Sequence, residues 1–303
     1  MTSDDAAPSR SLRRIGVMFD RDRRPEELSA YATEVEALGA DDLWVVEDLA
    51  WAGGVSSAAL ALAATERLRV GIGIMPAPLR NPALLAMEIA TLARVFPGRV
   101  VAGIGHGAPP WMAQVGAASP VKLALLEETI TAVRGLLAGE TVTVAGRAVR
   151  IDGVRLVHPP EVAPPLVAGV VRPRSLELSG RVADGTVMAE GQGPGVLKTA
   201  LGTIGRGRAS AAVSRPHELI SFTHLHVDDR PERVAEAVAP VIAEYTEWLG
   251  IPPEEVFLAA GDAATTARRI ESLWDAGAAT VVLRPVGDEP LSQVRAALAH
   301  LAR

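Results

Sequence analysis

Two adjacent carboxylates follow a short apolar segment in the first part of the chain. Glu47 and Asp48 come directly after Leu43–Val46, whose apolar residues are typical of a buried strand. Because neighbouring strand residues face opposite sides, we expect only one carboxylate to point toward a site at the strand end. A carboxylate in that place could position or protonate a substrate. Equally, it could pair with an arginine or cap the following helix.

A histidine between two glycines follows another such segment. His106 lies between Gly105 and Gly107, directly after the apolar run Arg99–Ile104. Glycine lets a ligand approach the backbone closely, and an imidazole can donate or accept a hydrogen bond or carry a proton near neutral pH. We therefore predict His106, together with the two carboxylates above, as candidate catalytic residues. A purely structural role for His106 is the alternative.

A third segment combines glycine and proline at the end of an apolar run. Arg69–Ile74 is followed by Met75, Pro76 and, two residues later, Pro78. Proline cannot pair its nitrogen in a ladder, and glycine permits a bulge or a close backbone approach. The segment therefore fits a backbone wall behind a flat ring, with a plain strand exit as the alternative.

A fourth segment has the character of an anion site. Gly169 is followed by Val170, Val171 and Arg172, and Arg174 comes at the start of a helical stretch. Free backbone amides at a helix start bind anions, and arginine adds charge and paired donors. We predict that a phosphate binds here. A surface turn with solvated arginines is the alternative.

Two histidines lie on one expected strand. His224 and His226 are two residues apart within Ile220–Val227, so they share one face of it. Such a pair can begin a metal site, but the remaining histidines of the chain show no ligand spacing. We predict packed or substrate-facing histidines and no bound metal.

The composition is that of a globular protein without extreme charge. Of the 303 residues 49% are hydrophobic, which provides for a large core, and the net charge of −6 argues against a nucleic-acid partner. The absence of cysteine excludes disulfides and cysteine nucleophiles. No apolar run is long enough for a membrane span, and residues 1–13 lack the apolar core of a signal peptide. We expect a mobile N-terminal tail on a cytoplasmic protein.

Short β-type runs alternate with amphipathic helical stretches. This alternation is typical of an α/β protein, and eight strands interleaved with helices favour a closed (β/α)8 TIM barrel formed by residues 14–303 as one domain. A doubly wound fold is the alternative, but no Gly-x-Gly-x-x-Gly opens the first βα turn. We expect a small hairpin insertion between strands four and five, over 141–156. The expected strands are Arg14–Phe19, Leu43–Val46, Arg69–Ile74, Arg99–Ile104, Leu166–Gly169, Thr186–Met188, Ile220–Val227 and Thr280–Leu283.

In such a barrel the active site lies at the carboxyl ends of the strands, on the loops that follow them. Eight short segments therefore have to contain it. They are Asp20–Arg24, Glu47–Gly54, Met75–Asn81, Gly105–Trp111, Gly169–Arg174, Ala189–Gly195, Asp228–Arg230 and Arg284–Asp288.

The order and spacing of several strings resemble the luciferase-like monooxygenase superfamily, especially its coenzyme F420-dependent oxidoreductases. The resemblance covers residues 14–285. It implies a TIM barrel, commonly dimeric, that holds a flavin or 5-deazaflavin at the strand ends. The strings are Gly39–Asp48, Arg69–Met75 followed by Arg80–Pro82, Pro97–Gly107, and Gly180–Gly185.

The resemblance also implies a set of cofactor-binding residues. In relatives a bulge after strand three, often with a non-prolyl cis peptide, backs the cofactor ring. The loop after strand four would line the cofactor, and residues after strands five and six would hold its phosphate. The residues so implied are Gly73, Ile74 and Met75; Gly105, His106 and Gly107; Gly169, Val170, Val171 and Arg172; and Ala189 and Glu190.

Two positions depart from the superfamily pattern. Many F420-dependent relatives have Asp-His where this chain has Glu47-Asp48, and some sugar-phosphate-oxidising members have a catalytic glutamate where this chain has Ala108. Sugar-phosphate oxidation is therefore in doubt, and His106 or Glu47 would have to manage the proton.

We expect an F420-dependent oxidoreductase that transfers a hydride between the deazaflavin and a small organic substrate. The closest alternative is an FMN-dependent monooxygenase of the same fold. A protein that binds a flavin or deazaflavin without catalysis is an alternative of another class, and a metal hydrolase built on His224 and His226 is a further one. Neither the substrate nor the direction of hydride transfer follows from the sequence.

Overall fold

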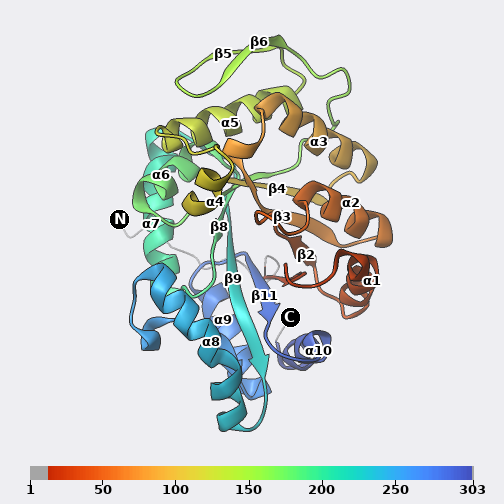
Figure 1. The fold of residues 1–303 in the computed structure, drawn as a ribbon, viewed down its shortest axis with the longest axis vertical. Helices are drawn as coiled ribbons and strands as arrows, with labels where there is room; N and C mark the ends of the chain where they lie inside the picture. The colour runs from red at the N-terminus through yellow and green to blue at the C-terminus, as the bar shows by residue number, and fades with distance from the viewer. Residues whose placement is uncertain (1–12, 302–303) are drawn as a thin grey trace.

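A computed structural model describes residues 13–301, and their strands close into a parallel barrel (Figure 1). Strands and helices alternate along the chain, as the apolar pattern predicts. The strands are β1 (Arg14–Met18), β2 (Asp42–Val45), β3 (Arg69–Pro76), β4 (Val100–Gly105), β5 (Val142–Ala145), β6 (Arg150–Val154), β7 (Leu166–Gly169), β8 (Gly185–Met188), β9 (Glu218–Val227), β10 (Ala259–Gly261) and β11 (Thr280–Pro285). The α-helices are α1 (Leu28–Ala37), α2 (Gly54–Ala64), α3 (Pro82–Val95), α4 (Pro109–Gln114), α5 (Lys122–Leu137), α6 (Pro173–Val182), α7 (Pro194–Ser210), α8 (Pro231–Leu249), α9 (Ala263–Asp275) and α10 (Pro290–His300).

The barrel closes through parallel pairing in the order β1-β2-β3-β4-β7-β8-β9-β11, with β11 returning to β1. This confirms the predicted TIM barrel and each of its eight predicted strands. Because all eight strands run the same way, their carboxyl ends form a single mouth, where barrel enzymes keep their sites.

The barrel interior is packed with apolar side chains rather than open. Trp44 and Phe222 meet edge to face at a centroid distance of 5.4 Å. Gly71 makes room for the indole, because a Cβ there would lie 2.5 Å from the ring of Trp44. The other interior side chains are Met18, Val101, Val167, Val187, Ile220 and Val282. This layer closes the barrel below the mouth.

A buried ionic cluster joins strands at the opposite, amino-terminal end of the barrel. Arg69 donates two hydrogen bonds to Asp42, at 3.0 and 2.7 Å, and two to Glu218, at 2.9 and 2.7 Å. Burial alone would lower the pKa of Arg69, but the bonds to Glu218 and Asp42 raise it above the usual value. The guanidinium thus bonds the buried Asp42 and the partly buried Glu218 and ties β2, β3 and β9 together.

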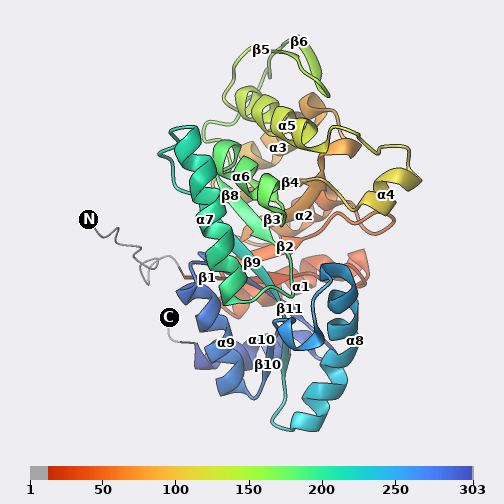
Figure 2. The ribbon, with the colours of Figure 1, turned by 90° about the vertical axis from the view of Figure 1, so that its left-hand side faces the viewer.

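The predicted hairpin insertion is present between β4 and β7. It consists of the two antiparallel strands β5 and β6, and β6 ends at Val154, two residues before the end of the expected range 141–156. Figures 1 and 2 both show it beyond α5, at the end of the molecule opposite α8, α9 and α10. It therefore lies away from the C-terminal half of the barrel.

Two elements are absent from the sequence prediction. Helix α4 begins within the expected strand-end segment Gly105–Trp111, and it has only six residues, two of them proline. Strand β10 has three small residues, and it pairs with Leu225–Val227 because the long β9 extends past β8. Neither element is long enough to give a readable periodicity.

The predicted N-terminal tail lies almost wholly outside the described residues, which begin at Arg13. Arg13 itself pairs with Asp275 at 2.6 Å. Among residues 13–301, none of the helices combines the length and the apolar character that a bilayer span requires.

Candidate functional site

The wall between β3, β4 and β7 is formed by a bulge at the end of β3. The peptide bond between Gly73 and Ile74 is cis, and the pairing of β3 with β4 shifts register between Ile72 and Met75. The half-buried Ile74 side chain lies against Gly105 and Gly169, where an added Cβ would come within 2.8 and 2.5 Å of it. These two glycines therefore make room for the side chain of Ile74. The side chain of Ile74 becomes the wall.

His106 connects the loop after β4 to the first turn of α6. Its Nε2 lies 3.0 Å from the hydroxyl oxygen of Ser175. Burial, assisted by the charge of Lys122, lowers the pKa of His106, so the neutral ring prevails at neutral pH. Gly107 has a φ of +69°, and an added Cβ would lie 2.9 Å from the sulfur of Met112. The loop is thus held by packing as well as by hydrogen bonding.

The predicted anion segment lies at the start of α6. No side chain caps this helix, and Pro173 occupies its first turn. Arg172 and Arg174 are exposed beside it. The amide of Val170 is not available to a ligand, because it donates to the carbonyl of Val187 at 3.3 Å in the sheet. The usable donors are therefore the amides beyond Val170 and the two arginines.

The two carboxylates after β2 have separate surroundings. Glu47 pairs with Arg80 through both oxygens, with the second bond at 2.8 Å, and accepts the amide of Gly54 at 3.0 Å. It thus pairs with an arginine and caps α2, the alternative that the sequence left open. Asp48 accepts a bond from Arg21 at 2.8 Å, and the Arg21 guanidinium lies over the ring of Trp51. These contacts favour a structural role for Glu47.

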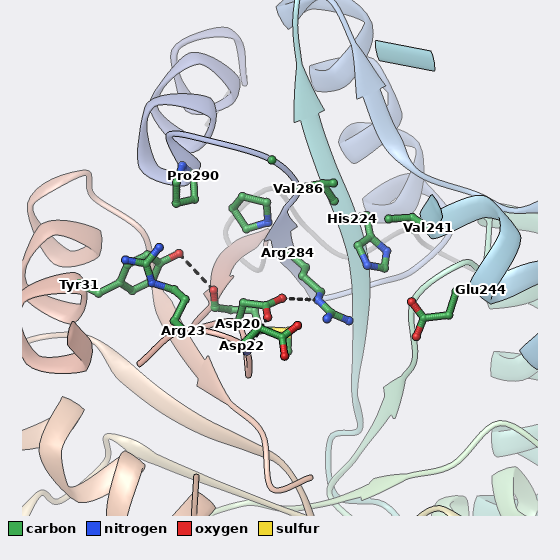
Figure 3. A pocket seen from close by; sticks show the side chains of 13 residues that line it. Asp20, Asp22, Arg23, Tyr31, His224, Val241, Glu244, Arg284, Val286 and Pro290 are labelled. Carbon is green, nitrogen blue, oxygen red and sulfur yellow. Dashed lines mark hydrogen bonds and ion pairs between the residues drawn. The ribbon is translucent and has the colours of Figure 1, made fainter. Parts of the chain in front are cut away.

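A cavity of about 350 Å³ opens at the β1, β9 and β11 side of the mouth (Figure 3). Arg284 at the end of β11 forms part of its wall and donates to Asp20 at 2.7 Å and to Glu190 at 3.3 Å. The lining residues are Met18, Asp20, Asp22, Arg23, Tyr31, His224, Val241, Glu244, Arg284, Pro285, Val286, Gly287 and Pro290.

The charges in this wall hold one another ionised. Burial opposes ionisation of Asp20, but the charge of Arg284 lowers its pKa overall. Burial likewise opposes ionisation of Glu190, and the neighbouring His224 and Arg284 lower its pKa overall. Burial works against the charge of Arg284 too, yet Glu190 and Asp20 raise its pKa. The result is one guanidinium shared between two carboxylates.

Two further side chains complete this cluster. Burial lowers the pKa of His224 to about 4, although Glu190 acts in the opposite direction, so the ring is neutral at neutral pH. Its ring meets that of Tyr245 edge to face at 5.1 Å. Burial and the charge of Glu190 raise the pKa of Tyr245.

Glu190 contacts the wall of the cavity through Arg284. The Glu190 carboxylate faces Arg284 of β11, and Ala189 precedes it at the end of β8. A carboxylate would also repel a phosphate. We therefore describe Glu190 together with Arg284, while its predicted contact with the cofactor phosphate stays a prediction.

The histidine pair on β9 divides between two environments. His224 lines the cavity, whereas His226 has its Nδ1 3.0 Å from the carbonyl oxygen of Val286. Within residues 13–301, no three His, Asp or Glu side chains gather closely enough to hold a metal ion. The packed or substrate-facing interpretation of the pair fits these contacts.

Asp20 and Arg284 are functional candidates that the sequence did not single out. Both lie in strand-end segments, so the barrel prediction placed them at the mouth. No local motif marks either one, because the bond between them joins residues 264 positions apart.

Comparison with protein families matches residues 9–295 to the luciferase-like monooxygenase model. The chain belongs to the luciferase-like monooxygenase family. This confirms the family resemblance at the level of the whole barrel.

Relatives within this family carry specific names. An F420-dependent glucose-6-phosphate dehydrogenase of Beutenbergia cavernae is 34% identical over 181 residues, covering 56% of this chain and 54% of the relative. A 5,10-methylenetetrahydromethanopterin reductase of Methanolobus tindarius is 27% identical over 219 residues, covering 72% and 66%. The chain thus matches only about half the length of the first of these relatives.

Solved structures confirm the fold. The coenzyme F420-dependent tetrahydromethanopterin reductase of Methanopyrus kandleri has a TM-score of 0.82 at 20% identity, covering 95% of this chain and 98% of that one. An F420-dependent secondary alcohol dehydrogenase, in complex with an F420-acetone adduct, has a TM-score of 0.84 at 21% identity, covering 96% and 99%. At such identities the likeness establishes the barrel alone.

Proposed function

We propose that this protein is an F420-dependent oxidoreductase that transfers a hydride between the deazaflavin and a small organic substrate. The observation that carries the proposal is the wall at the end of β3, with Ile74 over Gly105 and Gly169, in a family whose similar members include F420-dependent enzymes. A 5-deazaflavin supplies the hydride chemistry when bound, and the barrel supplies orientation and electrostatics.

The residues at the mouth fit such a group. Gly73, Ile74 and Met75 would back its ring, and the loop Gly105–Gly107 would line it. The uncapped start of α6, with Val171 and Arg172, would hold its phosphate, because backbone amides and guanidinium groups are the donors that phosphate accepts.

His106 is our candidate for managing the proton at this wall. It is neutral and half-buried, and the Ser175 contact fixes its orientation. Replacing His106 by Ala should lower turnover far more than cofactor affinity, because the ring would act on the reacting groups rather than on the phosphate. Unchanged turnover would remove His106 from the mechanism, and a matching loss of affinity would assign it to cofactor binding.

Titrations of the purified protein with F420 and with FMN, followed by cofactor fluorescence, test the proposal. Binding of F420 in preference to FMN is the expected result. Preference for FMN would move the protein to the monooxygenase branch, and binding of neither would refute the cofactor site. Tight binding without turnover of any donor or acceptor would indicate a non-catalytic binding protein.

Matched arginine variants locate the phosphate site. Arg172→Ala should weaken F420 binding about tenfold, the effect of losing one charge-assisted hydrogen bond. Arg150→Ala is the control, because Arg150 is an exposed arginine of the distant hairpin strand β6. Equal affinities for the two variants would place the phosphate elsewhere.

We also propose that the protein acts as a homodimer in the cytoplasm. The exposed apolar side chains Leu84 and Met87 on α3 support the dimer, because contact with a second subunit would bury them. Light scattering after size-exclusion chromatography should give twice the monomer mass of 31.7 kDa, and a monomer mass would refute the dimer. Fractionation of the source cells tests the location.

A further inference from the structure

The cavity beside Arg284 has the size and the composition of a small-molecule site. Its volume of about 350 Å³ lies within the range of ligand pockets. Apolar surface comes from Met18, Val241 and Val286. Polar groups come from the loop after β1, from β9 and β11, and from α1 and α8. Figure 3 shows Arg284 between Asp20 and His224, at the centre of this polar wall.

The arginines of this cavity are already paired. Arg284 is 13% exposed and bonds both Asp20 and Glu190, and Arg23 pairs with Glu27. The cavity also carries the carboxylates of Asp22 and Glu244. Negative groups thus outnumber positive ones. A phosphate or carboxylate ligand would find no unpaired cation among the described lining residues, so an anion would meet net repulsion.

In the described part of the chain, His224 has a polar ring atom without a partner beside the same cavity. The residue is only 3% exposed and it lines the cavity. Its Nδ1 is buried and has no hydrogen-bond partner among the described residues. A buried polar atom left without a partner is costly, and a ligand that hydrogen-bonds to it removes that cost.

We infer that this cavity is the substrate subsite, and that it takes a small alcohol or amine without any negative charge, hydrogen-bonded to the ring of His224. The inference deepens the proposed function, since the occupant is the organic substrate of that reaction. It excludes phosphorylated substrates, although the first relative named above is a glucose-6-phosphate dehydrogenase.

The imidazole of His224 and the surplus of carboxylates support this specificity. A hydroxyl or amine can donate to the imidazole, and a protonated amine also gains from the surplus of carboxylates. The shared guanidinium of Arg284 serves to hold Asp20 and Glu190 in place rather than to bind a substrate anion. His224 is therefore the substrate-binding residue, and Arg284 is the positioning residue.

NMR of the histidine rings tests the inference without any cofactor. The protein is labelled at histidine, of which it has six, and the His224 signal is identified by its loss in His224→Gln. Cyclohexanol or cyclohexylamine should shift the His224 signal in a saturable way. Inorganic phosphate and glucose 6-phosphate should leave it unchanged.

Other outcomes overturn the inference. A stronger shift with either phosphate probe would show that the cavity accepts anions. No shift with the alcohol or the amine, at concentrations that leave the protein folded, would show that His224 does not bind substrate. Because this measurement needs no F420, a failed F420 titration with a positive NMR result would refute the proposed cofactor and leave the subsite standing.

A gain of anion binding provides a second test. Asp20→Asn removes one of the two carboxylates that neutralise Arg284, so inorganic phosphate should now shift the His224 signal with at least tenfold higher affinity than in the unchanged protein. Asp229→Asn, at an exposed site outside the cavity lining, should change nothing. Equal phosphate affinities for both variants would refute the charge argument.

Discussion

Replacing Arg284 by Met tests whether the polar wall of the cavity depends on one guanidinium. The Arg284 side chain is 13% exposed, and its partners Asp20 and Glu190 are 24% and 11% exposed. Methionine keeps most of the apolar stem but removes every donor. Two carboxylates would then face each other across the wall without a cation.

The expected loss in the free energy of unfolding depends on which hydrogen bonds and how much contact with water each carboxylate retains. Breaking a buried ion pair by removing one partner costs about 3–5 kcal/mol. Asp20 retains the amide of Asp22 at 2.9 Å and borders the water-accessible cavity, so we expect the lower end, about 3 kcal/mol. For a chain of this size that loss lowers the melting temperature by roughly 5 °C.

Urea and thermal unfolding measure this loss. The control is Arg181→Met, which removes a surface pair with Glu127 at 3.3 Å and should cost less than about 1 kcal/mol. The loss in Arg284→Met should also shrink as the pH is lowered, because Glu190 can protonate once the guanidinium is gone. Equal losses for Arg284→Met and Arg181→Met would refute the shared-guanidinium interpretation.

The wall and the buried histidines give two more predictions. Gly169→Ala places a Cβ 2.5 Å from Ile74, so Ile74 must move and F420 binding should weaken about tenfold in a fluorescence titration. The free energy of unfolding should fall as the pH is lowered from about 6.5 toward 4 in urea titrations. Burial lowers the pKa of His217 and of His224 to about 4, so in that range the unfolded chain binds protons that the folded chain does not. Each histidine contributes at most about 1.4 kcal/mol per pH unit, and His217→Gln should remove its share.

Both predictions have matched controls. Gly202→Ala adds a Cβ with no neighbour within 4 Å, so it should bind F420 as the unchanged protein does. Equal binding by Gly169→Ala would mean that Ile74 does not form the cofactor wall. A stability that stays level between pH 6.5 and 4 would mean that the histidines titrate alike in the folded and unfolded chains.

The sequence by itself determined the barrel and the end of it that contains the site. Apolar runs such as Arg69–Ile74 and Leu166–Gly169 are bounded by glycine, proline and helical periodicity, and these signals depend only on near neighbours in the chain. The alternation therefore predicted eight strands and their carboxyl ends. It also located the irregular exit at Gly73, Ile74 and Met75 on the strength of the family resemblance.

The tertiary structure alone decided which polar groups meet. Nothing in the order Glu47-Asp48 shows that the first caps α2 with Arg80 while the second binds Arg21. Arg284 likewise bonds Asp20, which is 264 positions away in the chain, and Glu190, which is 94 positions away. Local patterns carry no information on such pairings, because they depend on the closure of the barrel and on which face each side chain takes.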